Sequence, residues 1–256
     1  MNRKPLLALL CALLVTVAGA VWATGAAADW APPNYQNVAT AIPGASGDRV
    51  SDLASKVRRV SGDMVTGSAV ATTSVTCDSC SGDAVTMQVL YARNVETVHV
   101  NNVAAAWSAC TGCQGSALSL QVIIARSAKQ LLVNNRSLAL NTACLDCHTV
   151  AAAVQIVLIS PHRNRLSAEV VDSLVALREQ LHQQLLAELA APPTAPAAAA
   201  RMAAPRAAAP PAVRPGIAAP STAASPVDAT VLAIQQQLAA DLQASASSHD
   251  IQLTHG

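Results

Sequence analysis

The chain has 256 residues, a formal net charge of +1 and only 12% charged residues. Without a basic field or an acidic run, the composition excludes charge-driven binding of nucleic acid. Aromatic residues make up 2% of the chain, and Ala inflates the 52% hydrophobic fraction. Because aromatic and large aliphatic side chains supply most core burial, we expect a small core and some length without structure.

Residues 1–28 have the features of a secretory signal. Arg3 and Lys4 precede an apolar stretch, and a small-residue site suits cleavage before Asp29. An uncleaved membrane anchor is the alternative, although the apolar stretch is slightly short for a span. Cleavage would remove Cys11 and leave six cysteines, all in Cys-x-x-Cys pairs. Paired cysteines in an exported protein indicate disulfides.

A lead-in at residues 29–62 is weakly patterned and is broken by Pro and Gly. Within it, Ser51 is a candidate N-cap, which predicts a short helix over residues 52–60. From residue 63 to residue 160 the pattern changes to a β repeat whose first cysteines are 33 and 34 positions apart. Internal periodicity of this kind is typical of folds that stack one supersecondary unit on the next.

Each unit of the repeat has a Cys-x-x-Cys pair followed at fixed positions by an Ala and a Gln. The cysteine pairs are Cys77–Cys80, Cys110–Cys113 and Cys144–Cys147, and the other repeated residues are Ala84, Gln88, Ala117, Gln121, Ala151 and Gln155. After each pair, alternate residues form an apolar row, and the residues between them are small or polar. This alternation is that of a half-buried strand.

Strands are also predicted before the cysteine pairs, at residues 68–76, 98–109 and 131–143, and the last two share the triplet Val-Asn-Asn. The unit is therefore a strand, a Cys-x-x-Cys turn and a second strand. A β-turn brings residues i and i+3 within about 7 Å, and a disulfide needs a Cα separation of roughly 4.4–6.8 Å. Each pair can therefore form a local disulfide across its turn.

The sequence predicts a mainly β fold of three Cys-clipped hairpins. An antiparallel meander is the simplest topology, and a β-solenoid with columns of Cys and Gln is the alternative. The choice matters because successive cysteine turns lie roughly 9–10 Å apart in a meander. Solenoid rungs are about 4.8 Å apart, a spacing at which two pairs could share a zinc ion.

Two helices are predicted after the repeat. The first covers residues 166–189, begins after Ser167 as N-cap and packs on the sheet, with self-association as the alternative. Its apolar stripe consists of Val170, Leu174, Leu177, Leu181 and Leu185. An Ala/Pro-rich segment at residues 191–224 is predicted to be disordered. Beyond it, a short helix begins near Pro226, and the last dozen residues are expected to be frayed.

Chemical interpretations of the cysteines are structural, metal-binding or redox, in that order. Redox chemistry is disfavoured because strands, rather than a helix N-terminus, flank the pairs. Cys147 and His148 complete the c-type haem pattern C-x-x-C-H, but the equivalents of His148 are Ser81 and Gln114. The repeat thus explains these cysteines without haem, and we expect no cofactor. No His-Glu-x-x-His or G-x-S-x-G motif occurs, so no catalytic residue is assigned.

The third unit resembles a repeat of exported actinobacterial proteins. The matching pattern is Asn135, Asn141, Cys144, Cys147, Thr149, Ala151, Ala153 and Gln155. A similar repeat occurs in the extracytoplasmic tail of proteins described as peptide zinc metalloproteases. The first two units depart from it, since Gly82 and Gly115 stand where the third has Thr149. The resemblance implies an exported, cysteine-paired β repeat, and it carries over no catalytic residue.

These features predict an exported, non-enzymatic structural or interaction module of the cell envelope, stabilised by three local disulfides. Its partner would be an unidentified protein or envelope component. Membrane contact is expected only through the signal, and self-association is left open. A zinc-binding exported protein is the first alternative, and a thiol–disulfide redox protein is the second.

Overall fold

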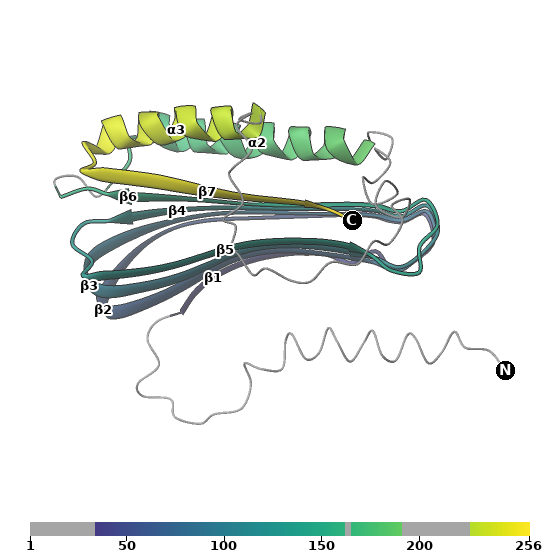
Figure 1. Cartoon of the computed structure of the whole chain (residues 1–256). Helices are drawn as coiled ribbons and strands as arrows, with labels where there is room; N and C mark the ends of the chain where they lie inside the picture. The colour runs from purple at the N-terminus through teal and green to yellow at the C-terminus, as the bar shows by residue number, and fades with distance from the viewer. Residues whose placement is uncertain (1–33, 162–164, 191–225) are drawn as a thin grey trace, which may run out of the picture. The chain divides into compact units, whose positions relative to one another are not determined.

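Successive units of the repeat stack as the rungs of a β-solenoid of about four turns (Figure 1). The computed structural model describes residues 34–161, 165–190 and 226–256. The predicted signal at residues 1–28 and the predicted linker at residues 191–224 lie outside the described residues. The strands are β1 (Asn34–Ala41), β2 (Arg49–Val75), β3 (Ser81–Ser108), β4 (Gln114–Ala125), β5 (Gln130–Asn141), β6 (His148–Ile159) and β7 (Ala246–His255). The helices are α2 (Ala168–Ala190) and α3 (Pro226–Leu242).

The solenoid has two facing sheets, because β2 and β3 each bend from one into the other. The helix-side sheet contains residues 49–60 of β2, residues 81–92 of β3, and β4, β6 and β7. The opposite sheet contains β1, residues 66–75 of β2, residues 97–108 of β3, and β5. At the bends, Gly62 and Asn94 have φ values of 130° and 51°.

All strands except β7 pair in parallel with their neighbours. Of the two topologies that the sequence left open, the protein has the solenoid, and its cysteine pairs lie at corners between sheets rather than at hairpin tips. The register places Gln88 beside Gln121 and Gln121 beside Gln155. Equivalent residues of successive units can stack in one column in this way because the strands run parallel.

Two expectations from the sequence were wrong. The helix predicted at residues 52–60 is instead part of β2, whose Asp52 lies beside Ala84 of β3. The C-terminal residues expected to be frayed form β7, which pairs antiparallel with β6. In both cases the neighbouring rung supplies backbone hydrogen-bond partners, and this long-range pairing overrides a weak local pattern.

The two helices pack on the outer face of the helix-side sheet (Figure 1). The predicted stripe of α2 is buried against the apolar rows of β3, β4 and β6. The backbone N–H of Val170 donates to Ser167 Oγ at 3.4 Å, so the predicted N-cap is confirmed. Among the described residues, neither helix is long and apolar enough to cross a membrane.

The small and polar rows of the repeat face inward, between the two sheets. Ala84, Ala117 and Ala151 are completely buried there. The sheets lie close together beside the cysteine corner, where a Cβ added to Gly82 would lie 2.6 Å from Thr73 Cγ2. Strands β4 and β6 and residues 81–92 of β3 are therefore buried on both faces, whereas the alternation predicted one buried face.

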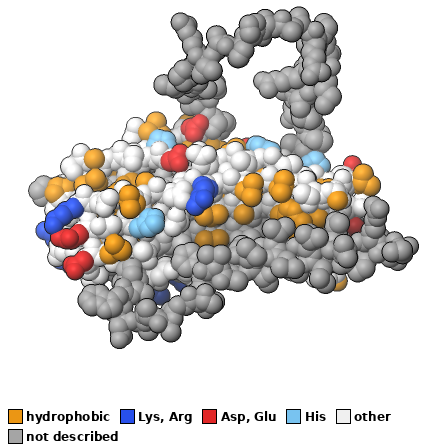
Figure 2. All heavy atoms as spheres, turned by 60° about the horizontal axis from the view of Figure 1, so that its bottom comes forward, with side chains coloured by type: hydrophobic (Ala, Val, Ile, Leu, Met, Phe, Trp, Pro, Cys, Tyr) orange, Lys and Arg blue, Asp and Glu red, His pale blue; other side chains and the backbone are white. Residues whose placement is uncertain are grey.

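The outer face of the opposite sheet is exposed between the two ends of the solenoid. Its side chains include Val38, Leu132, Leu138 and Leu140, which are 44–58% exposed. In Figure 2, which brings this side of the molecule forward, hydrophobic side chains are scattered over the surface, with only a few charged groups and His side chains between them. Within the described residues, the two sheets thus have unlike outer faces: helices cover one, and no further element covers the other.

Candidate functional site

The three cysteine pairs stack at one corner of the solenoid. Their Cα–Cα distances are 5.6, 6.0 and 5.7 Å from the first pair to the third. All three lie in the range that a disulfide requires, and the sulfurs of each pair are bonded. The predicted local pairing of the six cysteines is therefore confirmed.

Each cysteine turn has the same backbone shape. The residue before the second cysteine, which is Ser79, Gly112 or Asp146, has φ between 54° and 65°. Glycine and small polar residues tolerate this left-handed conformation best. Successive turns also bond to each other, since the N–H of Ser79 donates to Thr111 O and that of Gly112 donates to Leu145 O, both at 2.8 Å. The corner is thus a continuous hydrogen-bonded ladder.

Stacking also brings sulfurs of different rungs together. The Sγ atoms of Cys110, Cys113 and Cys147 all lie within 4.8 Å of one another, and the first two residues are buried. This is the cross-rung proximity expected of a solenoid. As thiolates, the three residues would supply three of the four ligands of a tetrahedral zinc site. As disulfides, they offer no thiolate to a metal.

The repeated Gln residues form a ladder inside the solenoid. Gln155 Nε2 donates to Gln121 Oε1 at 2.7 Å, and Gln121 Nε2 donates to Gln88 Oε1 at 2.8 Å. At the end of the ladder, Gln88 Nε2 donates to the carbonyls of Tyr35 and Ser68 on the opposite sheet. All three Gln side chains are buried, so these bonds satisfy groups that would otherwise destabilise the interior.

A second set of inward amides, which sequence reasoning did not assign a role, links the two sheets. Asn37 Nδ2 donates to Ala54 O at 3.1 Å and to Met87 O at 2.9 Å, so it joins two rungs. Asn102 and Asn135 make the corresponding bonds further along. The shared Val-Asn-Asn triplet was the available signal, since its second Asn is the inward residue.

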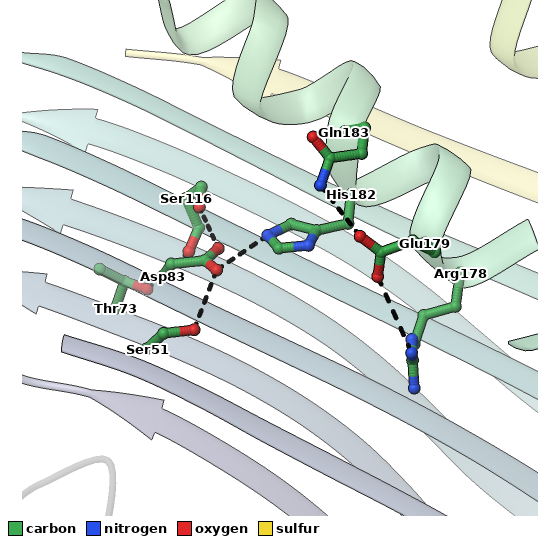
Figure 3. A network of polar contacts seen from close by, with 8 residues as sticks. All are labelled: Ser51, Thr73, Asp83, Ser116, Arg178, Glu179, His182 and Gln183. Atoms are coloured by element: carbon green, nitrogen blue, oxygen red, sulfur yellow. Dashed lines mark hydrogen bonds and ion pairs between the residues drawn. The ribbon is translucent and has the colours of Figure 1, made fainter. Parts of the chain in front are cut away.

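A polar network connects α2 to the helix-side sheet (Figure 3). His182 Nε2 lies 2.8 Å from Asp83 Oδ2, and the hydroxyls of Ser51 and Ser116 both donate to the same carboxylate. Thr73, from the opposite sheet, donates to the carbonyl of Ser116 at 2.7 Å. Because both serines contact Asp83 rather than His182, the arrangement is not the relay of a serine hydrolase.

The charges of this network stabilise each other. Burial opposes ionisation of Asp83, but its hydrogen bonds with His182, Ser116 and Ser51 outweigh burial and hold the pKa of the carboxyl below its ordinary value of 3.8. The hydrogen bond to Asp83 raises the pKa of His182 above its ordinary 6.5, against the effect of desolvation. The network therefore favours a charged pair that fastens α2 to the sheet.

A cleft of about 590 Å³ lies between residues 57–59 of β2 and the start of α2. Its lining includes Arg58, Arg59, Arg165 and Tyr91, and Asp172 is the one acidic residue among the described lining residues. Burial raises the pKa of Tyr91, and this effect is opposed by a hydrogen bond with the Leu166 backbone and by the charges of Arg165 and Arg59.

His148, the residue that completed the haem-like pattern, is the first residue of β6 and directly follows the third cysteine corner. Its backbone N–H donates to Cys113 O at 2.9 Å, which extends the ladder described above. Ser81 and Gln114 begin the equivalent strands β3 and β4. All three positions therefore have the same structural place, as the repeat predicted.

No protein-family model matches this chain. The comparisons with curated proteins and with solved structures also found no match.

Proposed function

We propose that the protein is an exported, non-enzymatic structural or interaction module of the cell envelope, stabilised by three local disulfides. The cysteine corner is the observation that carries this proposal. Three disulfides occur in register along one edge of the solenoid, each closing the same turn. Disulfides of this kind persist in oxidising compartments outside the cytoplasm.

The use of the repeated polar residues also supports a structural role. The amide nitrogens of Gln121 and Gln155 donate to the neighbouring Gln of the ladder, and Asn102 and Asn135 bond backbone carbonyls across rungs. These side chains are buried or partly buried and already have hydrogen-bond partners. The residues that define the repeat therefore build the solenoid, while its outer surfaces remain for contact with a partner.

A thiol count on protein purified from an oxidising compartment tests the proposal. We expect no free thiol among the six repeat cysteines, and peptide mapping should recover each Cys-x-x-Cys peptide with its own disulfide. N-terminal sequencing of the same sample shows whether the chain begins at Asp29, as export with cleavage requires. Six titratable thiols in the folded, exported protein would contradict the proposal.

Zinc binding is the second candidate, and the close approach of Cys110, Cys113 and Cys147 is the observation that favours it. Elemental analysis of the purified protein separates the two candidates. The disulfide proposal predicts no stoichiometric zinc. Zinc that is lost in Cys147→Ser but retained in Cys77→Ser, which changes a cysteine outside the cluster, would establish the metal site instead.

A further inference from the structure

The two ends of the solenoid differ in how their strand edges are covered. At the C-terminal end, β7 pairs with β6 along the helix-side sheet, while β5 of the opposite sheet pairs with β3 on one side and its Asn135 donates to Asp250 O of β7. At the other end, residues 49–60 pair with residues 81–92 on one side only, within the part of the chain that the structure describes. Their outer backbone groups therefore form an open edge.

The neighbouring edge of the opposite sheet is partly closed by side chains. Asp52 Oδ2 accepts a hydrogen bond from Thr40 N at 2.7 Å, and Lys56 Nζ donates to Gln36 O at 3.0 Å. These bonds occupy one backbone donor and one backbone acceptor of β1. Residues 49–60 form the longer open edge at this end, since β1 has only 8 residues.

This open edge has apolar side chains in a fixed alternation. Leu53 and Val57 lie beside Val85 and Val89, which continue the same rows beneath the helices. Leu53 is 51% exposed and Val57 is 46% exposed, whereas Val85 and Val89 are buried. An added strand with apolar side chains at matching positions would extend the rows by one rung and cover the exposed pair.

The same strand carries the exposed arginines Arg49, Arg58 and Arg59. None of them lies within 4.0 Å of a carboxylate oxygen among the described residues. Arg58 and Arg59 also line the cleft at the start of α2 together with Arg165. These arginines concentrate positive charge at this edge, whereas the whole chain has a net charge of only +1.

We propose that residues 49–60 bind an extended acidic segment of a partner protein as an additional β-strand. Backbone hydrogen bonds to the open edge would provide affinity, and contacts with the alternating side chains would provide specificity. Acidic side chains of the segment would approach Arg58, Arg59 and Arg165 at the cleft. A second copy of this chain is a poor occupant, because its own edge arginines would face these.

The inference rests on the interaction role proposed above and names the chemistry of the partner. It is tested with a fluorescent synthetic peptide about as long as this strand, in which Glu alternates with Val. Fluorescence anisotropy of the labelled peptide with the full protein should show saturable binding that weakens with salt. A peptide with Lys in place of Glu should not bind.

Two further controls separate strand addition from simple attraction between charges. A peptide N-methylated at alternate residues keeps its carboxylates but loses the N–H groups that face the edge, and it should bind at least about tenfold more weakly. The double variant Arg58→Glu/Arg59→Glu should weaken binding of the unmodified peptide by about tenfold or more. Arg136→Glu, which changes an exposed arginine on the opposite sheet, should leave binding unchanged.

Circular dichroism of each variant checks that the solenoid is retained. Binding that survives N-methylation would show a general anion site and overturn the inference, as would binding that is insensitive to the arginine changes. Absence of binding to all peptides would leave the arginines as protection of the edge against aggregation and would equally overturn it. None of these outcomes alters the thiol count, so failure here is distinguishable from failure of the proposed function.

Discussion

The solenoid interior and the interface beneath the helices are both buried, yet they are built from different residues. Inside, Ala columns alternate with ladders of Gln and Asn, and a separate apolar cluster that includes Leu90, Val100 and Ile123 lies beyond them. Under the helices, the contacts are made by Val, Leu, Ile and Met. The two layers are the two faces of the same strands, so the alternation in each unit produces both at once.

This difference shows how a parallel stack can bury polar groups. A buried amide normally needs a partner placed by an unrelated part of the chain. In the solenoid, the equivalent residue one rung away supplies that partner, as Gln88 does for Gln121. The helix-covered face has no such internal partners and relies on burial of the apolar area of its large side chains.

The largest effect is expected at the helix interface. Leu177 of α2 is 2% exposed and packs on the apolar rows of the sheet. Leu177→Ala should lower the free energy of unfolding by about 2–5 kcal/mol, through lost burial and the cavity that remains. Chemical denaturation of the purified variant and wild type measures this change in the free energy of unfolding. The control Leu138→Ala, at a site that is 58% exposed on the opposite sheet, should change stability by no more than about 0.5 kcal/mol.

A somewhat smaller loss is expected in the ladder. Gln121→Leu leaves Gln88 Oε1 without its donor and Gln155 Nε2 without its acceptor, at about 1–2 kcal/mol for each buried group. We therefore expect a total loss of about 2–4 kcal/mol by denaturation. Replacing all three Gln residues with Leu should cost less than the sum of the single changes. Strict additivity would show that the ladder is not a coupled unit.

A third prediction tests how closely the two sheets pack beside the cysteine corner. Gly82→Ala adds a Cβ that would lie 2.6 Å from Thr73 Cγ2, so we expect a loss of about 1–3 kcal/mol. Thr73→Ser removes that methyl group and keeps a hydroxyl for Ser116 O. The double variant should therefore recover part of the loss. If Gly82→Ala is neutral, the interior has more space there than the structure indicates.

The smallest effect is expected at the charged pair between α2 and the sheet. Because the folded pKa of His182 is raised, its contribution is complete below its ordinary value of 6.5 and is lost as the pH rises through the folded pKa. The folded pKa of Asp83 is lowered, so its carboxylate stabilises the folded state fully above pH 3.8. This stabilisation is lost as the pH falls through the folded pKa.

Wild type should accordingly exceed His182→Gln in stability by no more than about 1 kcal/mol, and most clearly near pH 5–6. The difference should shrink as the pH rises above 6.5. Thermal unfolding at several pH values measures it. Glu169→Gln, which changes an exposed carboxylate in the first turn of the same helix, serves as the control. A stability difference that grows towards alkaline pH would contradict the assignment.

Much of the architecture could be read from local patterns. The cysteine spacing indicated three local disulfides, and the apolar stripe from Val170 to Leu185 indicated that α2 packs on the sheet. The expectations for residues 52–60 and for the C-terminal strand were wrong because neither segment has a strong pattern of its own. Their strand conformation comes from pairing with β3 and β6, which lie far away in the sequence.

Among the candidate sites, too, some follow from residues close together in the chain and others depend on how the strands stack. Cys77 and Cys80 are three residues apart, so their pairing follows from chain geometry alone. The cross-rung cluster of Cys110, Cys113 and Cys147 exists only because the strands stack in parallel, and spacing along the chain did not decide between meander and solenoid. The contact between Asp83 and His182 joins residues 99 positions apart, and no local signal marked either one.

By itself, the sequence determined the repeat, the local cysteine pairs, the alternation of the strands and the amphipathic helix, because each depends on residues close together in the chain. The tertiary structure alone decided which face of each strand is the interior and which strand edges are open among the described residues. Those properties depend on which strands become neighbours. The inner face of a strand is defined only once the second sheet lies opposite it. A strand edge is open only where no further strand of the described chain pairs with it.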